Sequence, residues 1–127
     1  MITPFEARHG LIVVITRRFG RNGERAVQMA LDTGTTSTTV RNSVLLRLGY
    51  DPAVSAERVR MTTASGVEYV PRVCVERIDA LGERRTSFMV VGHTLPPSAT
   101  VDGLLGLDFL RGRRVVLDFR NGAIVVD

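Results

Sequence analysis

The stretch VQMALDTGTTSTTV, residues 27–40, places one acidic residue at the end of an apolar segment. Val27, Met29 and Leu31 alternate with smaller or polar residues, and this period of two predicts a half-buried strand. Asp32 follows at once, although an unpaired charge in a protein core is energetically costly. An Asp in a turn after a strand is common, and Gly34 allows a sharp turn whose amide points at the acid. The stretch therefore predicts either a simple turn or a carboxylate that is held rigidly for chemistry.

Short strands joined by turns account for most of the chain. The Asn-Gly pair at residues 22–23 is a strong signal of a two-residue hairpin turn, within a hairpin over residues 9–31. The chain is expected to close with a second hairpin around Asn121-Gly122. Two more strands are expected around a turn near residues 64–66, and another strand over residues 84–92. Strands and helices do not alternate regularly, so the chain is expected to be all-β or nearly so.

Two short helices are expected among the strands. The period changes over residues 41–50, RNSVLLRLGY, where Asn42 or Ser43 can cap a helix and Gly49 suits its end. The predicted buried face of this helix consists of Val44, Leu45 and Leu48. A second helix is expected shortly after Gly106.

Composition limits the classes of protein to consider. The chain has 127 residues, of which 44% are hydrophobic and 24% charged, as in a globular domain, and we expect one domain over residues 1–127. No apolar run approaches the ~20 residues that span a bilayer, and the start resembles no signal peptide, so we expect a cytoplasmic protein without a membrane partner. All 17 basic residues are Arg and the net charge is +4. Because they are scattered and not interleaved with aromatics, no nucleic-acid partner is expected.

Other residues that could carry chemistry have simpler explanations. Cys74 is the only cysteine, which excludes an intrachain disulfide, and it is expected to be a small buried apolar residue. His9 and His93 lack the spacing of metal ligands, so we expect no metal site and no cofactor. Tyr69 is expected to face solvent or core from a strand. Asp102 precedes a glycine without an intervening hydroxyl residue, so it is expected to be a loop or substrate-lining residue.

A second informative segment is VDGLLGLDFL, residues 101–110, about seventy residues after the Asp-Thr-Gly. ALDTGTTSTTV resembles the active-site loop of aspartic proteases, and VDGLLGLDFL resembles the apolar-apolar-Gly-x-(Asp/Asn) segment of retroviral-type proteases. MTTASG, residues 61–66, lies where that family places its flap. Residues 9–126 in particular resemble the bacterial single-domain retropepsin-like proteins. The resemblance implies an all-β, closed or partly open acid-protease barrel with one or two short helices, a single lobe that dimerises.

The resemblance also implies a function, that of a homodimeric aspartic endopeptidase. Asp32 of each subunit would share one proton and activate a water molecule for attack on an extended peptide, and no metal or cofactor would be needed. Thr33 would bond across the dimer axis, while Gly34 and Thr35 would complete the active-site loop. The flap over the substrate would consist of Thr63, Ala64, Ser65 and Gly66. Structural support of the site would come from Leu104, Leu105, Gly106 and Asp108.

The sequence departs from the retroviral pattern at two charged positions. Thr36 and Leu107 stand where many retroviral proteases carry an acid and an Arg that brace the dimer. A dimer would need other contacts, such as pairing of the chain termini as strands. The alternative function is therefore a catalytically inert dimerisation or peptide-binding module on the same fold. DTGTTST also resembles the first phosphate loop of actin-like ATPases and sugar kinases, but that fold needs two large lobes and a much longer chain.

Overall fold

The structure is a computed structural model that describes residues 1–6, 8, 10–20, 22–63, 65–96 and 99–127. His9 and Ala64, which were assigned roles from the sequence, lie outside the described residues, as does the side chain of Thr63. The strands are β1 (Ile2–Pro4), β2 (Val13–Gly20), β3 (Gly23–Leu31), β4 (Thr39–Arg41), β5 (Arg58–Thr63), β6 (Gly66–Ala80), β7 (Glu83–His93), β8 (Gly103–Leu105), β9 (Val115–Asp118) and β10 (Ala123–Val126). The helices are α1 (Asn42–Leu48), the short 3₁₀ turn η1 (Pro52–Val54) and α2 (Leu107–Leu110).

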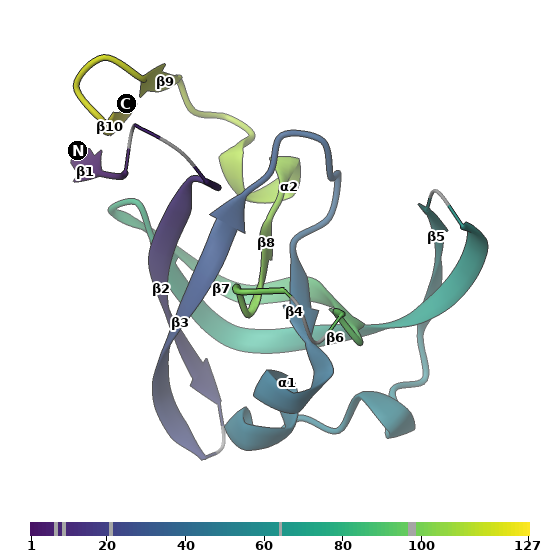
Figure 1. Cartoon of the computed structure of the whole chain (residues 1–127). Helices are drawn as coiled ribbons and strands as arrows, with labels where there is room; N and C mark the ends of the chain where they lie inside the picture. Colours follow the sequence, from purple (N-terminus) through teal and green to yellow (C-terminus); the bar gives the residue numbers. More distant parts are fainter. Residues whose placement is uncertain (7, 9, 21, 64, 97–98) are drawn as a thin grey trace.

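Seven strands form one sheet that curls into a partly open barrel. Its order is β2-β3-β8-β4-β7-β6-β5, and the long β6 bends back to pair with β2 as well. The β5–β6 hairpin curves outward from the barrel on one side (Figure 1). This all-β architecture with two short helices confirms the predicted fold class.

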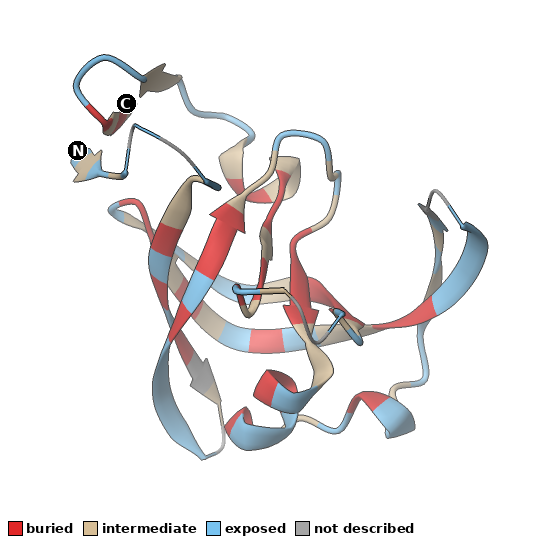
Figure 2. Cartoon of the chain, viewed as in Figure 1, coloured by how far each residue is buried: buried red, intermediate tan, exposed pale blue. Residues whose placement is uncertain are grey.

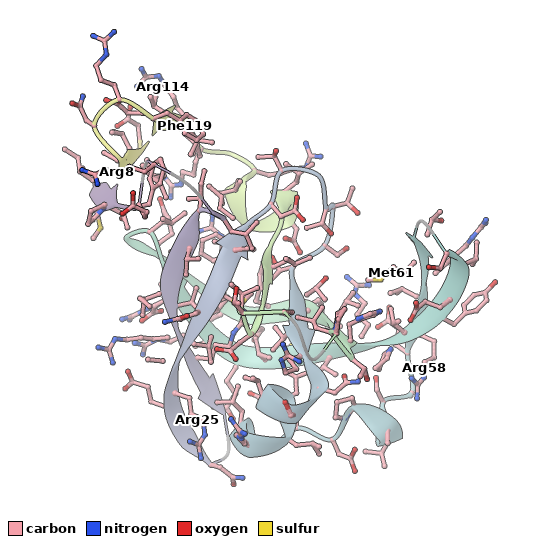
Figure 3. All side chains as sticks on the ribbon, in the orientation of Figure 1. Arg8, Arg25, Arg58, Met61, Arg114 and Phe119 are labelled. Carbon is pink, nitrogen blue, oxygen red and sulfur yellow. The ribbon has the colours of Figure 1, made fainter. Side chains whose placement is uncertain are left out.

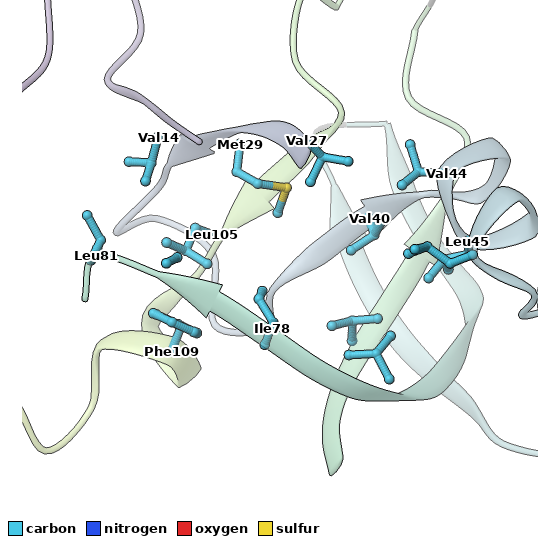
Figure 4. Close-up of a cluster of buried hydrophobic side chains, with 14 of the residues drawn as sticks. Val14, Val27, Met29, Val40, Val44, Leu45, Ile78, Leu81, Leu105 and Phe109 are labelled. Carbon is cyan, nitrogen blue, oxygen red and sulfur yellow. The ribbon is translucent and has the colours of Figure 1, made fainter. Parts of the chain in front are cut away.

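The barrel encloses the hydrophobic core. β3 contributes Val27 and Met29, β8 contributes Leu105, and α2 contributes Phe109, all buried (Figure 4). Burial is concentrated in the barrel, whereas the outer part of the β5–β6 hairpin is exposed (Figure 2). The second half of β3, where Val27, Met29 and Ala30 are buried, is therefore fixed by core packing just before Asp32.

A separate three-stranded sheet joins the two ends of the chain. Its order is β1-β10-β9, and Ile2–Pro4 pairs antiparallel with residues 123–125 of β10. Both termini lie in this sheet, at one end of the molecule (Figure 1). The hairpin of β9 and β10 was predicted from Asn121-Gly122, but β1 was not, because its partner lies more than a hundred residues away. The termini thus pair as strands within one chain.

Two local predictions require correction. Helix α1 has the predicted buried face and ends at Gly49 with a φ of 97°, but Arg41 is its N-cap residue and no side chain caps it. The helix starts directly from β4, and the Asn42 side chain instead donates to Thr94 Oγ1 at 3.2 Å. Cys74 is exposed. Its neighbour Val75 is fully buried, and alternation along β6 directs Cys74 to the opposite face.

Candidate active site

Asp32 lies immediately after β3, and the chain around it holds its backbone and carboxylate. The Asp32 amide donates to the Leu105 carbonyl at 3.0 Å, and the Gly34 amide donates to Asp32 Oδ1 at 2.8 Å. A Cβ atom on Gly34 would lie 3.0 Å from the same oxygen, so glycine permits this approach. Asp32 is half-buried rather than enclosed in the core. Water access and an amide donor together avoid the cost of an isolated buried charge.

The segment after β8 crosses the Asp32 loop and bonds to its backbone. β8 runs parallel to β3, with Leu31 opposite Leu105. Leu104 is a half-buried residue of β8, opposite Ala30 of β3. Leu107 N donates to Thr35 O at 2.9 Å, and a Cβ on Gly106 would lie 3.0 Å from that same carbonyl oxygen. The structure thus brings together two segments that lie far apart in the sequence, and Gly106 makes their close approach possible.

Asp108 anchors the far end of the loop through Thr38. Its two carboxylate oxygens accept the Thr38 amide at 3.0 and 2.9 Å, and Oδ1 also accepts the Thr38 hydroxyl at 2.6 Å. The Thr38 oxygen in turn accepts the Gly106 amide at 3.1 Å. Thr38 is fully buried, and sequence reasoning missed it, because the run of hydroxyl residues does not reveal which of them faces Asp108. Asp108 therefore has a supporting geometry rather than one that faces a substrate.

Helix α2 is held from outside by an arginine that the sequence did not single out. Arg85 Nη2 donates to the Phe109 carbonyl at 3.0 Å, and its guanidinium lies 5.0 Å from the centre of the Phe109 ring. Glu83 pairs with Arg85 at 3.5 Å and with Arg113 at 2.9 Å. The first residue of α2, Leu107, carries no charge that could form an ion pair. The contacts of Arg85 and Glu83, which belong to the same chain, therefore hold α2 in place.

A cavity of about 310 Å³ separates the Asp32 loop from β5. Residues 34–37, residues 59–62 and Val91 line it, and Met61 extends from β5 toward the barrel (Figure 3). The predicted flap residues Ser65 and Gly66 lie at the hairpin tip, beyond this lining. Sequence reasoning therefore found the hairpin but missed the part of β5 that borders the cavity.

The remaining candidate residues lie apart from the cavity or serve the backbone. His93 Nε2 lies 3.1 Å from Glu68 Oε1, and Tyr69 is 70% exposed. Asp102 Oδ2 accepts the Gln28 amide at 3.0 Å, which ties the start of β8 to β3. Among the described residues, no group of three or more His, Cys, Asp or Glu side chains could hold a metal ion.

Thr33 is exposed at the outer edge of the loop. In the described part of the chain its hydroxyl has no hydrogen-bond partner, whereas the neighbouring Thr35 hydroxyl donates to Ser37 O at 3.3 Å. None of the described helices has the length and apolar character needed to cross a membrane.

Comparison with known proteins identifies the family. No curated protein sequence is similar enough to count as a relative. A retropepsin-like aspartic protease from Rickettsia conorii has the same fold, with a TM-score of 0.73 and 16% identity over 99% of this chain and 88% of that one. The EIAV protease, in complex with the inhibitor HBY-793, has a TM-score of 0.60 and 17% identity over 82% of this chain and 88% of that one. The sequence model of the aspartyl protease family matches residues 18–109, so the chain belongs to this family and is an aspartic-type endopeptidase with a retropepsin-like fold.

Proposed function

We propose that two copies of this chain form a homodimeric endopeptidase in which the two Asp32 carboxylates act as one catalytic pair. The observation that carries the proposal is the Asp32 loop itself. One carboxylate, oriented by the Gly34 amide and accessible to water, ends a rigid strand, and the chain contains a single Asp-Thr-Gly. A two-fold axis beside the loop would supply the second acid from the same residue. On this proposal, residues 1–127 form one protease domain.

The chemistry follows from placing two carboxylates a few ångströms apart. They cannot both ionise, so the pair retains one proton and titrates as a unit. The ionised Asp32 takes a proton from a bound water molecule while the protonated Asp32 polarises the scissile carbonyl and then returns a proton to the leaving amine. The Thr33 hydroxyl, unpaired in the described part of one chain, is available to bond across the axis.

Substrate would bind as an extended strand between the loop and the β5–β6 hairpin. β5 is the outermost strand of its sheet, so its free edge can pair with a peptide backbone. Gly34 and Thr35 border the cavity from the loop side. The hairpin tip at Ser65 and Gly66 would act as the flap and exclude water from the reaction.

The dimer would be stabilised without the charged brace of the retroviral pattern. β1 and β9 are the outer strands of the terminal sheet, each paired on one side only in the described structure. Ile2 of β1 is 69% exposed, and Phe119, in the turn after β9, is 59% exposed. Free strand edges beside exposed apolar side chains favour association with a second copy.

The test compares the wild type with Asp32→Asn on a library of unfolded peptides between about pH 3 and 8. We expect cleavage by the wild type at mildly acidic pH and none by the variant. Asp51→Asn is the matched control, because among the described residues the Asp51 side chain accepts a hydrogen bond from the Ala53 amide alone, at the start of η1. Equal cleavage by wild type and Asp32→Asn would exclude Asp32 as the catalytic acid.

A mixing experiment tests whether the site is shared between subunits. Asp32→Asn protein added to a fixed amount of wild type should inhibit it, because mixed dimers contain only one carboxylate. Asp51→Asn protein should not inhibit. A folded dimer, seen by light scattering, that cleaves no peptide would support the inert module instead, which the uncharged Thr36 and Leu107 favour.

A further inference from the structure

The cavity between the active-site loop and β5 has a mixed polar and apolar lining, and Arg60 is the one charged residue among the described residues that line it. Hydroxyl groups of Thr35, Thr36 and Ser37 line one side, and Thr62 lines the other. No described residue of the lining carries a carboxylate. Four successive residues of β5, residues 59–62, border the cavity, although successive side chains leave a strand on opposite faces.

Arg60 has no counter-ion in the described part of the chain. The acidic residues of the same hairpin have other partners: Glu57 lies 2.9 Å from Arg72, and Glu68 lies 3.1 Å from His93. Arg60 is exposed, and its cross-strand neighbour is the uncharged Tyr69. Its guanidinium is therefore exposed and forms no ion pair in the described part of the chain, beside a cavity that Arg60 helps to line.

We propose that Arg60 makes this cavity a subsite for an acidic side chain, Asp or Glu, of the substrate peptide. The inference rests on the proposed peptidase function, because the substrate strand must run along β5 for one of its side chains to enter the cavity. A guanidinium binds a carboxylate through two parallel hydrogen bonds, and the hydroxyls of Thr36, Ser37 and Thr62 can donate to the same oxygens. The residue selected lies close to the scissile bond, because Gly34 and Thr35 border both Asp32 and the cavity.

The experiment uses two synthetic peptide pools that are identical except that one contains Glu and Asp where the other contains Gln and Asn. For the wild type we expect kcat/KM about tenfold higher on the acidic pool, the effect of a charge-assisted hydrogen bond in a partly exposed site. Arg60→Glu should remove this preference and favour a third pool that contains Lys and Arg. A reversed charge preference in Arg60→Glu can come only from a folded variant, so it distinguishes selection by charge from a loss of folding.

Arg58→Glu is the matched control. Arg58 lies two residues earlier on β5 and carries the same charge, but it borders a different cavity with Pro52 and Pro71. It lies nearer the base of the hairpin (Figure 3). This variant should keep the wild-type preference, so an equal loss in both variants would indicate a non-specific effect of net charge and overturn the proposal.

Binding measured with the Asp32→Asn variant makes the result independent of turnover. Fluorescence anisotropy should show about tenfold tighter binding of the acidic pool than of the amide pool, and this difference should vanish when Arg60→Glu is added. Equal binding of the two pools would overturn the role of Arg60 even if the wild type cleaves both. Selective binding without any cleavage would instead support the subsite and contradict the proposed peptidase activity.

Discussion

Arg18 is a charged side chain enclosed in the barrel, and it offers a quantitative test of the structure. It lies on β2, opposite Arg25 of β3 and Ile78 of β6, and its exposure is 0%. Nη2 lies 3.4 Å from Met29 Sδ, whereas Nε and Nη1 have no partner among the described residues. Burial lowers the pKa of Arg18 to about 10, an effect that the charge of Asp102 partly offsets. The folded state therefore pays a desolvation cost for this guanidinium at neutral pH.

The size of that cost follows from the pKa. The value lies roughly 2.5 pH units below the ordinary one of arginine, and each unit corresponds to about 1.36 kcal/mol, so the cost is about 3 kcal/mol. Arg18→Met removes the charge while a flexible thioether chain, although shorter than arginine, keeps apolar contact in the same part of the core. We expect the free energy of unfolding to rise by about 1 to 3 kcal/mol, since part of the gain is lost to imperfect repacking.

The assay is urea unfolding at pH 7, followed by circular dichroism, with Arg17→Met as the control. Arg17 lies next to Arg18 but its side chain is 62% exposed, and it pairs with Glu24. Removing such a surface pair should change stability by less than about 1 kcal/mol. A thermal melt provides a second measurement, at about 4 °C per kcal/mol for a chain of this size.

The difference in unfolding free energy between the wild type and Arg18→Met should depend on pH. Between about pH 10 and 12.5 the unfolded chain retains a proton on Arg18 that the folded chain has released, so wild-type stability gains from this group as pH rises. The advantage of Arg18→Met should therefore be full at pH 7 and smaller at about pH 10.5. A variant that is less stable than the wild type by the same amount at both pH values would refute the reasoning and show that the guanidinium is well satisfied.

Three further predictions concern the supports of the site and of the barrel. Asp108→Ala should lower the free energy of unfolding, measured in urea, by about 2 to 4 kcal/mol. The reason is that the amide and hydroxyl of buried Thr38 lose their acceptor. The Asn oxygen of Asp108→Asn still accepts the hydroxyl, so an Asp108→Asn variant as unstable as Asp108→Ala would contradict this prediction. Gly103→Ala should prevent folding, seen by circular dichroism, because its Cβ would lie 2.2 Å from a carbonyl oxygen of β4. The hydrogen bond from Arg77 lowers the pKa of Asp79, with smaller contributions from charge. Asp79 therefore stabilises the fold above its unfolded pKa, and this stabilisation is lost as pH falls. In Asp79→Asn, the free energy of unfolding should decrease less steeply than in the wild type as pH falls below about 5.

Local signals in the sequence predicted the elements that local interactions determine. The Asn-Gly pairs predicted the β2–β3 and β9–β10 hairpins, although Gly23 already belongs to β3 and four residues, 119–122, join β9 to β10. The apolar spacing of residues 44–48 predicted the buried face of α1. Both depend on residues close together in the chain. The N-cap of α1 could not be predicted in the same way, because Arg41 is fixed by its place in β4, between β7 and β8.

The parts that sequence reasoning missed depend on contacts across the fold. β1 has a strand pattern too short to stand out and is stabilised by β10 at the other end of the chain. Thr38 is one of several hydroxyl residues in a row, and only the approach of α2 selects it. Arg60 lies on a strand that was predicted, yet the cavity beside it exists only because the loop after β3 lies opposite.

The supports of the Asp32 loop also bear on the proposed dimer. The hydrogen bonds that position the loop, from Leu105, Gly34 and the Thr38–Asp108 pair, come from a single chain, and Arg85 fixes α2 in that same chain. Association would therefore bring two preformed loops together instead of shaping them. A weak dimer would then lose activity on dilution through the fraction of paired subunits, while the fold of each subunit stays intact. Without the charged brace, the subunits would separate and activity would fall at a higher protein concentration. The geometry of each Asp32 carboxylate within its own subunit would stay unchanged.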